Sequence, residues 1–249
     1  MNEAKVILLE EIKESFRNKK VLFVVFIYLA LLIIGLKKAY QFSLTFGFLL
    51  SKFYFFTQQK PPYALLFFYF MSIIALPLFS LLLSYDSVSG ELSKRTVRYL
   101  ATRANRGYII IGKFLGNYLV NISVNFLVYL VAVSYIYAKS GESVFIQGIA
   151  LWLYLSIYSL YFVSLSLLAS SFTSKPSQSL FLGAAFFVGL LLFLLKGSLK
   201  VISPYHYYTD GFYVLTGPLP GITNSIFVLI LSSLIFIVLS LMIFKRRDL

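Results

Sequence analysis

The sequence contains no cysteine and a single histidine among its 249 residues. The absence of cysteine excludes disulfides, thiolate metal sites and cysteine nucleophiles. Charged residues are also scarce, at 12% of the chain. The sequence lacks an HExxH pattern and any paired-carboxylate arrangement, and its histidine, His206, lies among tyrosines. We therefore expect neither a metal site nor a catalytic site in this chain.

Apolar residues take the place of the missing charge. The chain is 59% hydrophobic and 18% aromatic, with a mean hydropathy of +0.86. This is more apolar surface than a soluble fold of this length could bury, which indicates a membrane protein. A net charge of +13 would suggest nucleic acid in a soluble domain. Here the cations flank apolar stretches, so membrane lipids, and no nucleic acid, are the expected partners.

Apolar runs recur along the chain, and most reach the length of about 20 residues that a bilayer requires. The runs lie near 21–36, 64–84, 108–137, 146–171, 179–195 and 222–244. We predict an all-α polytopic membrane protein with six transmembrane helices. No internal repeat or dividing linker is visible, so residues 1–249 are treated as one domain.

Residues 3–20 alternate polarity at a helical period. Leu8, Leu9, Ile12 and Phe16 lie on one side, opposite charged residues. This pattern predicts an interfacial helix on the membrane surface, and the alternative is an amphipathic helix packed on the protein's own loops. With four glutamates among the first sixteen residues, we expect no cleavable export signal and a chain complete as written.

The distribution of cations predicts the orientation. With the N-terminus in the cytoplasm, 15 of the 22 lysines and arginines fall inside and 7 outside. This bias predicts that both termini are cytoplasmic in a multi-pass protein of the cell membrane. The segments 37–63 and 196–221 then face outward. Their aromatic, proline and glycine residues are typical of a headgroup-level belt, and the alternative is that one or both re-enter the bilayer.

The predicted spans contain no Asp, Glu, His or Arg in their interiors, and the nearest cation is Lys113, close to a cytoplasmic end. Ionisable residues at membrane depth usually mark ion or proton paths, so an ion-coupled secondary transporter is disfavoured. Residues 107–114 have the glycine and lysine spacing of a phosphate loop. They end in Phe114, where a Ser or Thr must bind magnesium, so ATP binding is not expected there.

The most charged part of the chain, residues 86–107, lies between the second and third spans. Asp86, Ser87 and Ser89 are candidate helix caps. Apolar or weakly polar residues repeat every four positions along one face, at Val88, Leu92, Thr96 and Leu100. The pattern predicts a short cytoplasmic helix over about 88–104.

At these residues the chain resembles the permease subunits of type 2 ATP-binding-cassette transporters, whose equivalent loop begins D-x-[IV]-S-G-E and ends in a Gly-Lys pair. Arg95 stands where that family usually has glycine, and Arg103 where it has proline. The matching residues are Asp86, Val88, Ser89, Gly90, Glu91, Thr96, Leu100, Arg106, Ile109, Gly112 and Lys113.

The resemblance implies an exporter that moves substrate outward, with a short coupling helix docked on a separate cytoplasmic ATPase that holds ATP and Mg. No cofactor is expected in this chain itself. Glu91 would anchor the docking surface, and Val88, Leu92 and Leu100 would fill the groove of the ATPase. Arg95, Arg98 and Arg103 would face ATPase acids or, alternatively, form a solvated loop on lipid phosphates.

The resemblance also implies a second permease subunit and re-entrant helices in 196–221. Asn117, Asn121 and Asn125 are spaced four apart on one face of the third span. This row could contact substrate in a pathway or hydrogen-bond a neighbouring helix. Two other functions compete with the permease: a non-transporting membrane scaffold or anchor and, less favoured, the ion-coupled transporter. Neither the substrate nor the choice between homodimer and heterodimer can be read from the sequence.

Overall fold

The computed structural model describes residues 2–17, 19–51, 63–94, 96, 105–141, 144–194, 200–207, 210–211, 214 and 222–247. Within these ranges every regular element is helical, which confirms the all-α prediction. In chain order the elements are α1 (Asn2–Arg17), α2 (Lys19–Ser51), α3 (Tyr63–Ser84), α4 (Ser89–Ser93), α6 (Arg106–Ser140), α7 (Phe145–Phe172), α8 (Pro176–Phe193), η2 (Lys200–Ile202), η3 (Pro204–Tyr207) and α10 (Ile222–Arg246).

Six of the described helices are long and apolar enough to cross a membrane, as predicted. The candidate spans are Val21–Lys38, Leu65–Ser93, Arg106–Lys139, Phe145–Phe172, Pro176–Phe193 and Thr223–Arg246. The first and fifth, which looked short as apolar runs, each reach 18 residues. At 1.5 Å per residue, 18 residues span about 27 Å, close to the thickness of the hydrocarbon core.

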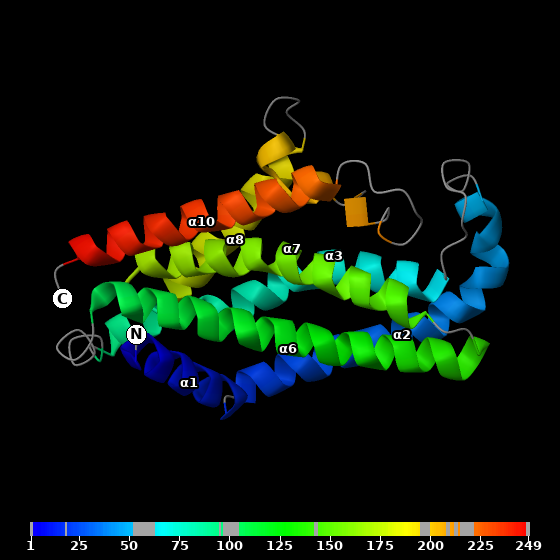
Figure 1. Cartoon of the computed structure of the whole chain (residues 1–249), viewed down its shortest axis with the longest axis horizontal. Helices are drawn as coiled ribbons and strands as arrows, with labels where there is room; N and C mark the ends of the chain where they lie inside the picture. The colour runs from blue at the N-terminus through cyan, green and yellow to red at the C-terminus, as the bar shows by residue number, and fades with distance from the viewer. Residues whose placement is uncertain are drawn as a thin grey trace.

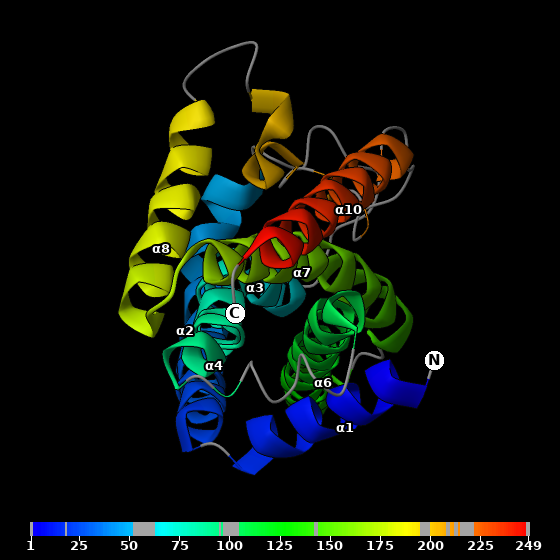
Figure 2. The ribbon, with the colours of Figure 1, turned by 90° about the vertical axis from the view of Figure 1, so that its left-hand side faces the viewer.

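The spans pack as a bundle around α7. Of the apolar stretch that defines each candidate span, 78% is buried inside the protein for α7 and 17% for α10. Helix α7 is therefore central, and α10 lies at the lipid-facing edge. Figure 2 shows this end-on, with α1 beside α6 on the outside of the bundle. Figure 1 shows both chain ends at one end of the bundle, here called the terminal end, and Figure 2, which is viewed from that end, shows α4 there as well.

Helix α2 corrects one predicted boundary. The segment 37–63 was expected to be an outer loop, yet α2 continues to Ser51. Residues 37–51 contain no proline, and the next prolines are Pro61 and Pro62, so nothing in this stretch interrupts the helical hydrogen bonds. Figure 1 shows the far end of α2 turned upward from the line of its first half.

The helix predicted over 88–104 is shorter in its described part, which ends at Ser93. The termination has a local cause. The amide of Thr96 donates to Glu91 O at 3.1 Å, and the Thr96 hydroxyl lies 3.3 Å from the same oxygen. This bond runs from residue i+5 to residue i, which closes the helix with a wide turn instead of another α-helical bond. Residues 95 and 97–104 lie outside the described residues.

The described part of the predicted outer segment 196–221 consists of η2, η3 and a few further residues. Hydrogen bonds that fasten it to the bundle involve Tyr154, Tyr161 and Ser203. Tyr154 donates to Tyr207 O at 2.7 Å, Tyr161 to Ile202 O at 3.3 Å, and Ser203 to Leu190 O at 2.8 Å. The choice between an aromatic belt and a re-entrant segment stays a prediction.

Candidate functional site

The described residues 86–94 and 96, between α3 and α6, are here called the segment 86–96, and they are hydrogen-bonded to the central helix α7 through Ser170. The hydroxyl of Ser170 on α7 accepts bonds from the amides of Val88 and Ser89 at 3.1 and 3.0 Å. It donates to Tyr85 O at 2.9 Å. The first amides of a helix have no partner inside the helix, so α7 supplies the cap of α4.

Two of the three residues predicted as caps, Ser87 and Ser89, make other bonds. Ser87 donates to Ser84 O at 3.0 Å, and Ser89 donates to Tyr85 O at 2.8 Å. Both hydroxyls therefore return to carbonyls at the end of α3. The cap comes instead from a residue 82 positions from Val88.

We expect Ser170→Ala to lower the free energy of unfolding by about 1–3 kcal/mol, because two buried amides lose their acceptor. Thermal melting of the purified protein in detergent measures the change. Ser123→Ala is the matched control, since Ser123 is exposed and donates to Leu119 O in its own helix. Equal melting temperatures for the two variants would contradict the capping role.

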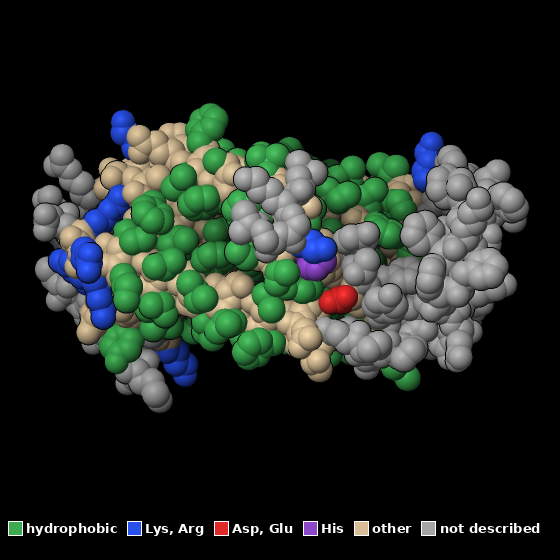
Figure 3. Space-filling model, turned by 90° about the horizontal axis from the view of Figure 1, so that it is seen from above, with side chains coloured by type: hydrophobic (Ala, Val, Ile, Leu, Met, Phe, Trp, Pro, Cys, Tyr) green, Lys and Arg blue, Asp and Glu red, His purple; other side chains and the backbone are tan. Residues whose placement is uncertain are grey.

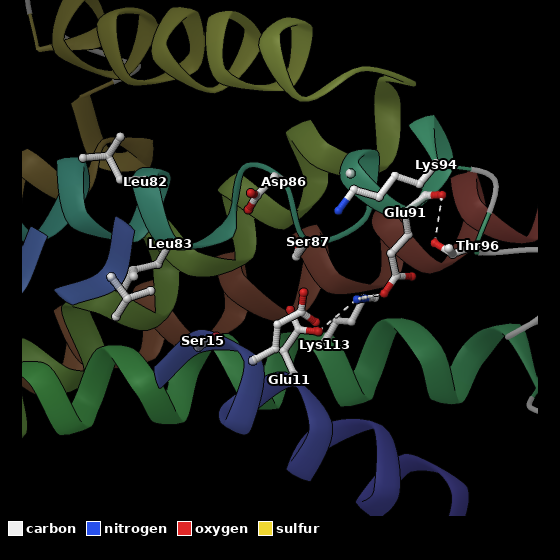
Figure 4. Close-up of a pocket in the computed structure, with 13 residues that line it drawn as sticks. Glu11, Ser15, Leu82, Leu83, Asp86, Ser87, Glu91, Lys94, Thr96 and Lys113 are labelled. Atoms are coloured by element: carbon white, nitrogen blue, oxygen red, sulfur yellow. Dashed lines mark hydrogen bonds and ion pairs between the residues drawn. The ribbon is translucent and has the colours of Figure 1, made fainter. Parts of the chain in front are cut away.

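A buried lysine joins three parts of the chain at the terminal end. Lys113 Nζ, on α6, lies 2.9 Å from Glu11 Oε2 on α1 and 2.6 Å from Glu91 Oε1 on α4. Figure 4 shows the three side chains converging from three separate ribbons. The exposed fractions of their side chains are 3% for Lys113, 13% for Glu11 and 25% for Glu91. We call this cluster the Lys113 bridge.

The charges of the Lys113 bridge need each other, because an isolated ion in a buried site is strongly unfavourable. Two carboxylates face one ammonium, so the cluster carries a net negative charge when all three groups are ionised. Burial raises the pKa of Glu11, and the nearby Lys113 ammonium opposes that rise in part. The Asn117 side-chain amide donates to Lys113 O at 2.9 Å and lies 3.4 Å from Glu11 Oε1.

Helix α1 sits very close to α6 beside this bridge. A Cβ placed on Gly116 would lie 2.8 Å from Glu11 Cβ and 2.9 Å from Glu11 Cγ. The absence of a side chain at Gly116 is therefore what lets Glu11 approach α6. Because Gly116 lies three residues after Lys113, the close approach and the ion pair occur on the same side of α6.

A cavity of about 290 Å³ separates α1 from the segment 86–96 at the bridge. Figure 4 shows its labelled lining residues, which come from α1, α3, α6 and the chain between α3 and α6. Four carboxylates line it, from Glu11, Glu14, Asp86 and Glu91, against the two ammonium groups of Lys94 and Lys113. Among the described residues, no group of three His, Asp or Glu side chains is arranged to hold a metal ion.

The chain that follows the segment is tied to the last helix. Arg106, at the start of α6, donates to the carbonyls of Lys245 and Arg247, each at 2.9 Å. Arg247 in turn donates to Phe172 O and Thr173 O at the end of α7, each at 2.9 Å. Guanidinium groups thus satisfy free carbonyls at the C-terminal ends of α10 and α7. The chain between α3 and α6 is anchored on both sides.

The predicted docking residues have different positions. Val88 is 1% exposed and packs in the protein's own core with Ile109, Ile110 and Phe114. Leu92 is partly buried against the same cluster. The structure thus gives Val88 an internal contact and Glu91 an internal ion pair. The remaining docking residues, Arg95, Arg98, Leu100 and Arg103, lie outside the described residues. Their docking roles, and that of Glu91, stay predictions.

The asparagine row on α6 faces the interior of the bundle. Asn117, Asn121 and Asn125 are all buried. The Asn121 amide donates to Ser80 Oγ on α3 at 2.9 Å, and Asn117 reaches toward Glu11 on α1. Both are contacts of the helix-interface kind. Neither side-chain polar atom of Asn125 has a hydrogen-bond partner. A role for this row in a substrate pathway stays a prediction.

Sequence reasoning missed Glu11 as a member of the site. A signal was available, because Lys113 is the nearest cation to the span interiors and a buried lysine requires a carboxylate partner. The amphipathic pattern of 3–20 placed most of its charges in solvent and gave no reason to single out Glu11. The roles of Ser170 and Arg247 had no local sequence signal.

The surface agrees with a membrane-embedded bundle. In Figure 3, hydrophobic side chains cover the middle of the molecule, and lysine and arginine side chains gather toward the terminal end, on the left. The exposed cations on α1, at the start of α2, after α4, before α8 and at the end of α10 are Lys5, Lys13, Arg17, Lys19, Lys94, Lys175, Lys245 and Arg246.

Comparison with known protein families finds one relationship that extends over nearly the whole chain. The sequence pattern of the family described as ABC-2 family transporter protein matches residues 5–249. Among curated proteins, no sequence matches at a significant level. The match includes the Lys113 bridge, the segment 86–96 and all six candidate spans.

Proposed function

The chain belongs to the ABC-2 family of transporter proteins, and from this premise we propose that it is the permease of an ATP-driven exporter powered by a separate cytoplasmic ATPase. Membership makes it a membrane-spanning component of an ABC transporter. This component is not itself catalytic. The proposal adds three things to that. The ATPase docks on residues 86–107, ATP and Mg bind to the ATPase, and substrate moves outward.

The observation that supports the proposal best is how the segment 86–96 is attached. It contacts α7 through Ser170 and α6 through Lys113, and the chain after it contacts α10 through Arg106. A partner that pushes or pulls on this segment would therefore act on three spans together. Hydrogen bonds and ion pairs suit this role. Because they act only at short distances and in defined directions, a small displacement of the segment moves the groups bonded to it.

The charge distribution supports a proposal for the orientation. We propose that the terminal end, with its exposed lysines and arginines, faces the cytoplasm, in accordance with the positive-inside bias. Both chain termini and the segment 86–96 would then lie on the side where a soluble ATPase can reach them. Two permease chains, identical or different, would form the pathway.

The docking proposal is tested at Lys94, which is exposed directly after α4. Lys94→Glu should weaken binding of the co-purifying ATPase about fivefold to tenfold, because it reverses a charge at the rim of the docking surface. Binding is measured by titrating the purified ATPase onto permease in phospholipid nanodiscs, and ATP hydrolysis is followed in parallel. Lys139→Glu, exposed near the other end of α6, is the control and should bind as the wild type does.

Two results would count against the proposal. One is a wild-type complex that contains no ATP-hydrolysing subunit, and the other is unchanged affinity in Lys94→Glu. Glu91→Arg is a poor test of docking, because it places a cation next to the buried Lys113 ammonium and would disturb the fold first.

A further inference from the structure

The Lys113 bridge connects two elements that differ in how firmly they are held. Helix α1 is seated on α6 through the close approach at Gly116 and through Ile7, which is buried with Ile109 and Ile110. The segment 86–96 includes only a five-residue helix, and it borders the cavity of about 290 Å³. Helices α1 and α6 therefore form the fixed side of the bridge. Ser170 and the buried Val88 hold the start of the segment, so its part with room to move begins at Glu91, beside the cavity.

The bridge also has an unequal arrangement of charge. One ammonium serves two carboxylates, so Lys113 can lose Glu91 and still keep Glu11 as a partner. Separating a buried lysine from its only partner is strongly unfavourable, whereas releasing one of two partners costs much less. Glu91 is the more exposed of the two carboxylates, at 25% against 13%, so water can solvate it when it is released.

We propose that Lys113 is a positioning residue that holds the segment 86–96 against α1 and α6, and that its bond to Glu91 opens and closes during transport while its bond to Glu11 persists. The inference rests on the proposed function, since the ATPase is what displaces the segment. Glu11 makes that displacement possible, because it retains the lysine when Glu91 leaves. Helix α1 thus acts in coupling.

The test measures the distance between α1 and the segment. The chain has no cysteine, so cysteines introduced at Glu10 and Ser93, both exposed, are its only thiol labelling sites. The doubly spin-labelled permease is purified with its ATPase and reconstituted in vesicles of phosphatidylethanolamine and phosphatidylglycerol. Electron–electron double resonance then gives the label distance without nucleotide and with a non-hydrolysable ATP analogue and Mg²⁺.

In the wild-type background the distance should shift when the nucleotide binds. In Glu11→Gln the shift should be lost and ATP hydrolysis by the complex should fall about tenfold, because release of Glu91 would leave the lysine without an anion. Glu14→Gln removes a carboxylate that lines the same cavity and should behave as the wild type does. Lys113→Arg keeps the cation and should retain the shift.

Three results would overturn the inference: no shift in the wild type, a normal shift in Glu11→Gln, or equal losses in Glu11→Gln and Glu14→Gln. If Glu11→Gln does not fold, Glu11→Asp replaces it, and an undiminished shift in that variant would count against the inference. Failure of the proposed function looks different, because no ATPase would accompany the wild type. An ATPase that binds and turns over normally in every variant would refute the Lys113 role alone.

Discussion

Lys113→Met is expected to lower the free energy of unfolding by about 3–5 kcal/mol, the largest loss among the substitutions considered. The methionine has a similar length but no charge, so Glu11 and Glu91 would lose the ammonium at 2.9 and 2.6 Å. Two carboxylates would then repel each other at a site where Glu11 is largely buried. The effect is measured by thermal melting in detergent. Melting is monitored as the loss of the monodisperse peak in size-exclusion chromatography.

The matched control is Lys13→Met, which removes an exposed lysine from α1 and should change stability by less than about 0.5 kcal/mol. A triple variant, Lys113→Met with Glu11→Met and Glu91→Met, separates stability from coupling. Replacing a whole buried ion cluster by apolar residues is often neutral, so most of the stability should return. Transport should not return. A Lys113→Met variant as stable as Lys13→Met would show that the bridge contributes little.

Asn125→Leu is expected to stabilise the protein, in contrast to Lys113→Met, and to raise the free energy of unfolding by about 1–3 kcal/mol. Asn125 is fully buried, and neither its amide nitrogen nor its amide oxygen has a hydrogen-bond partner. An unsatisfied polar group in such a site is destabilising, and a leucine of similar volume removes it. The measurement is again thermal melting, and transport is assayed in parallel.

Asn121→Leu provides the comparison, because the Asn121 amide donates to Ser80 Oγ at 2.9 Å. That substitution breaks a bond between α6 and α3 and should give no gain in stability. If Asn125→Leu is more stable but transports poorly, the asparagine serves the substrate pathway. A lower melting temperature for Asn125→Leu than for the wild type would contradict the assignment of its amide as unsatisfied.

Much of the architecture was readable in advance. The six spans, the amphipathic start and the special character of residues 86–107 follow from hydropathy, helical period and charge. Each of these properties can be read from a short stretch of neighbouring residues. The errors were at boundaries: α2 runs to Ser51, and the described part of the helix after α3 stops at Ser93. Helix α2 continues because no proline interrupts it before Pro61. The helix after α3 ends where the Thr96 amide bonds back to Glu91 O.

The sequence by itself determined an all-α membrane protein with six candidate spans, because a helix satisfies its own backbone hydrogen bonds in lipid and hydropathy marks where an apolar helix is long enough to cross. Only the tertiary structure decided which partners the polar residues have. Lys113 meets Glu11 across 102 positions, and Ser170 caps α4 across 82. Such pairs depend on how whole helices pack. The sequence indicates only that a charge near a span, such as Lys113, needs a partner, and it does not show which residue that partner is.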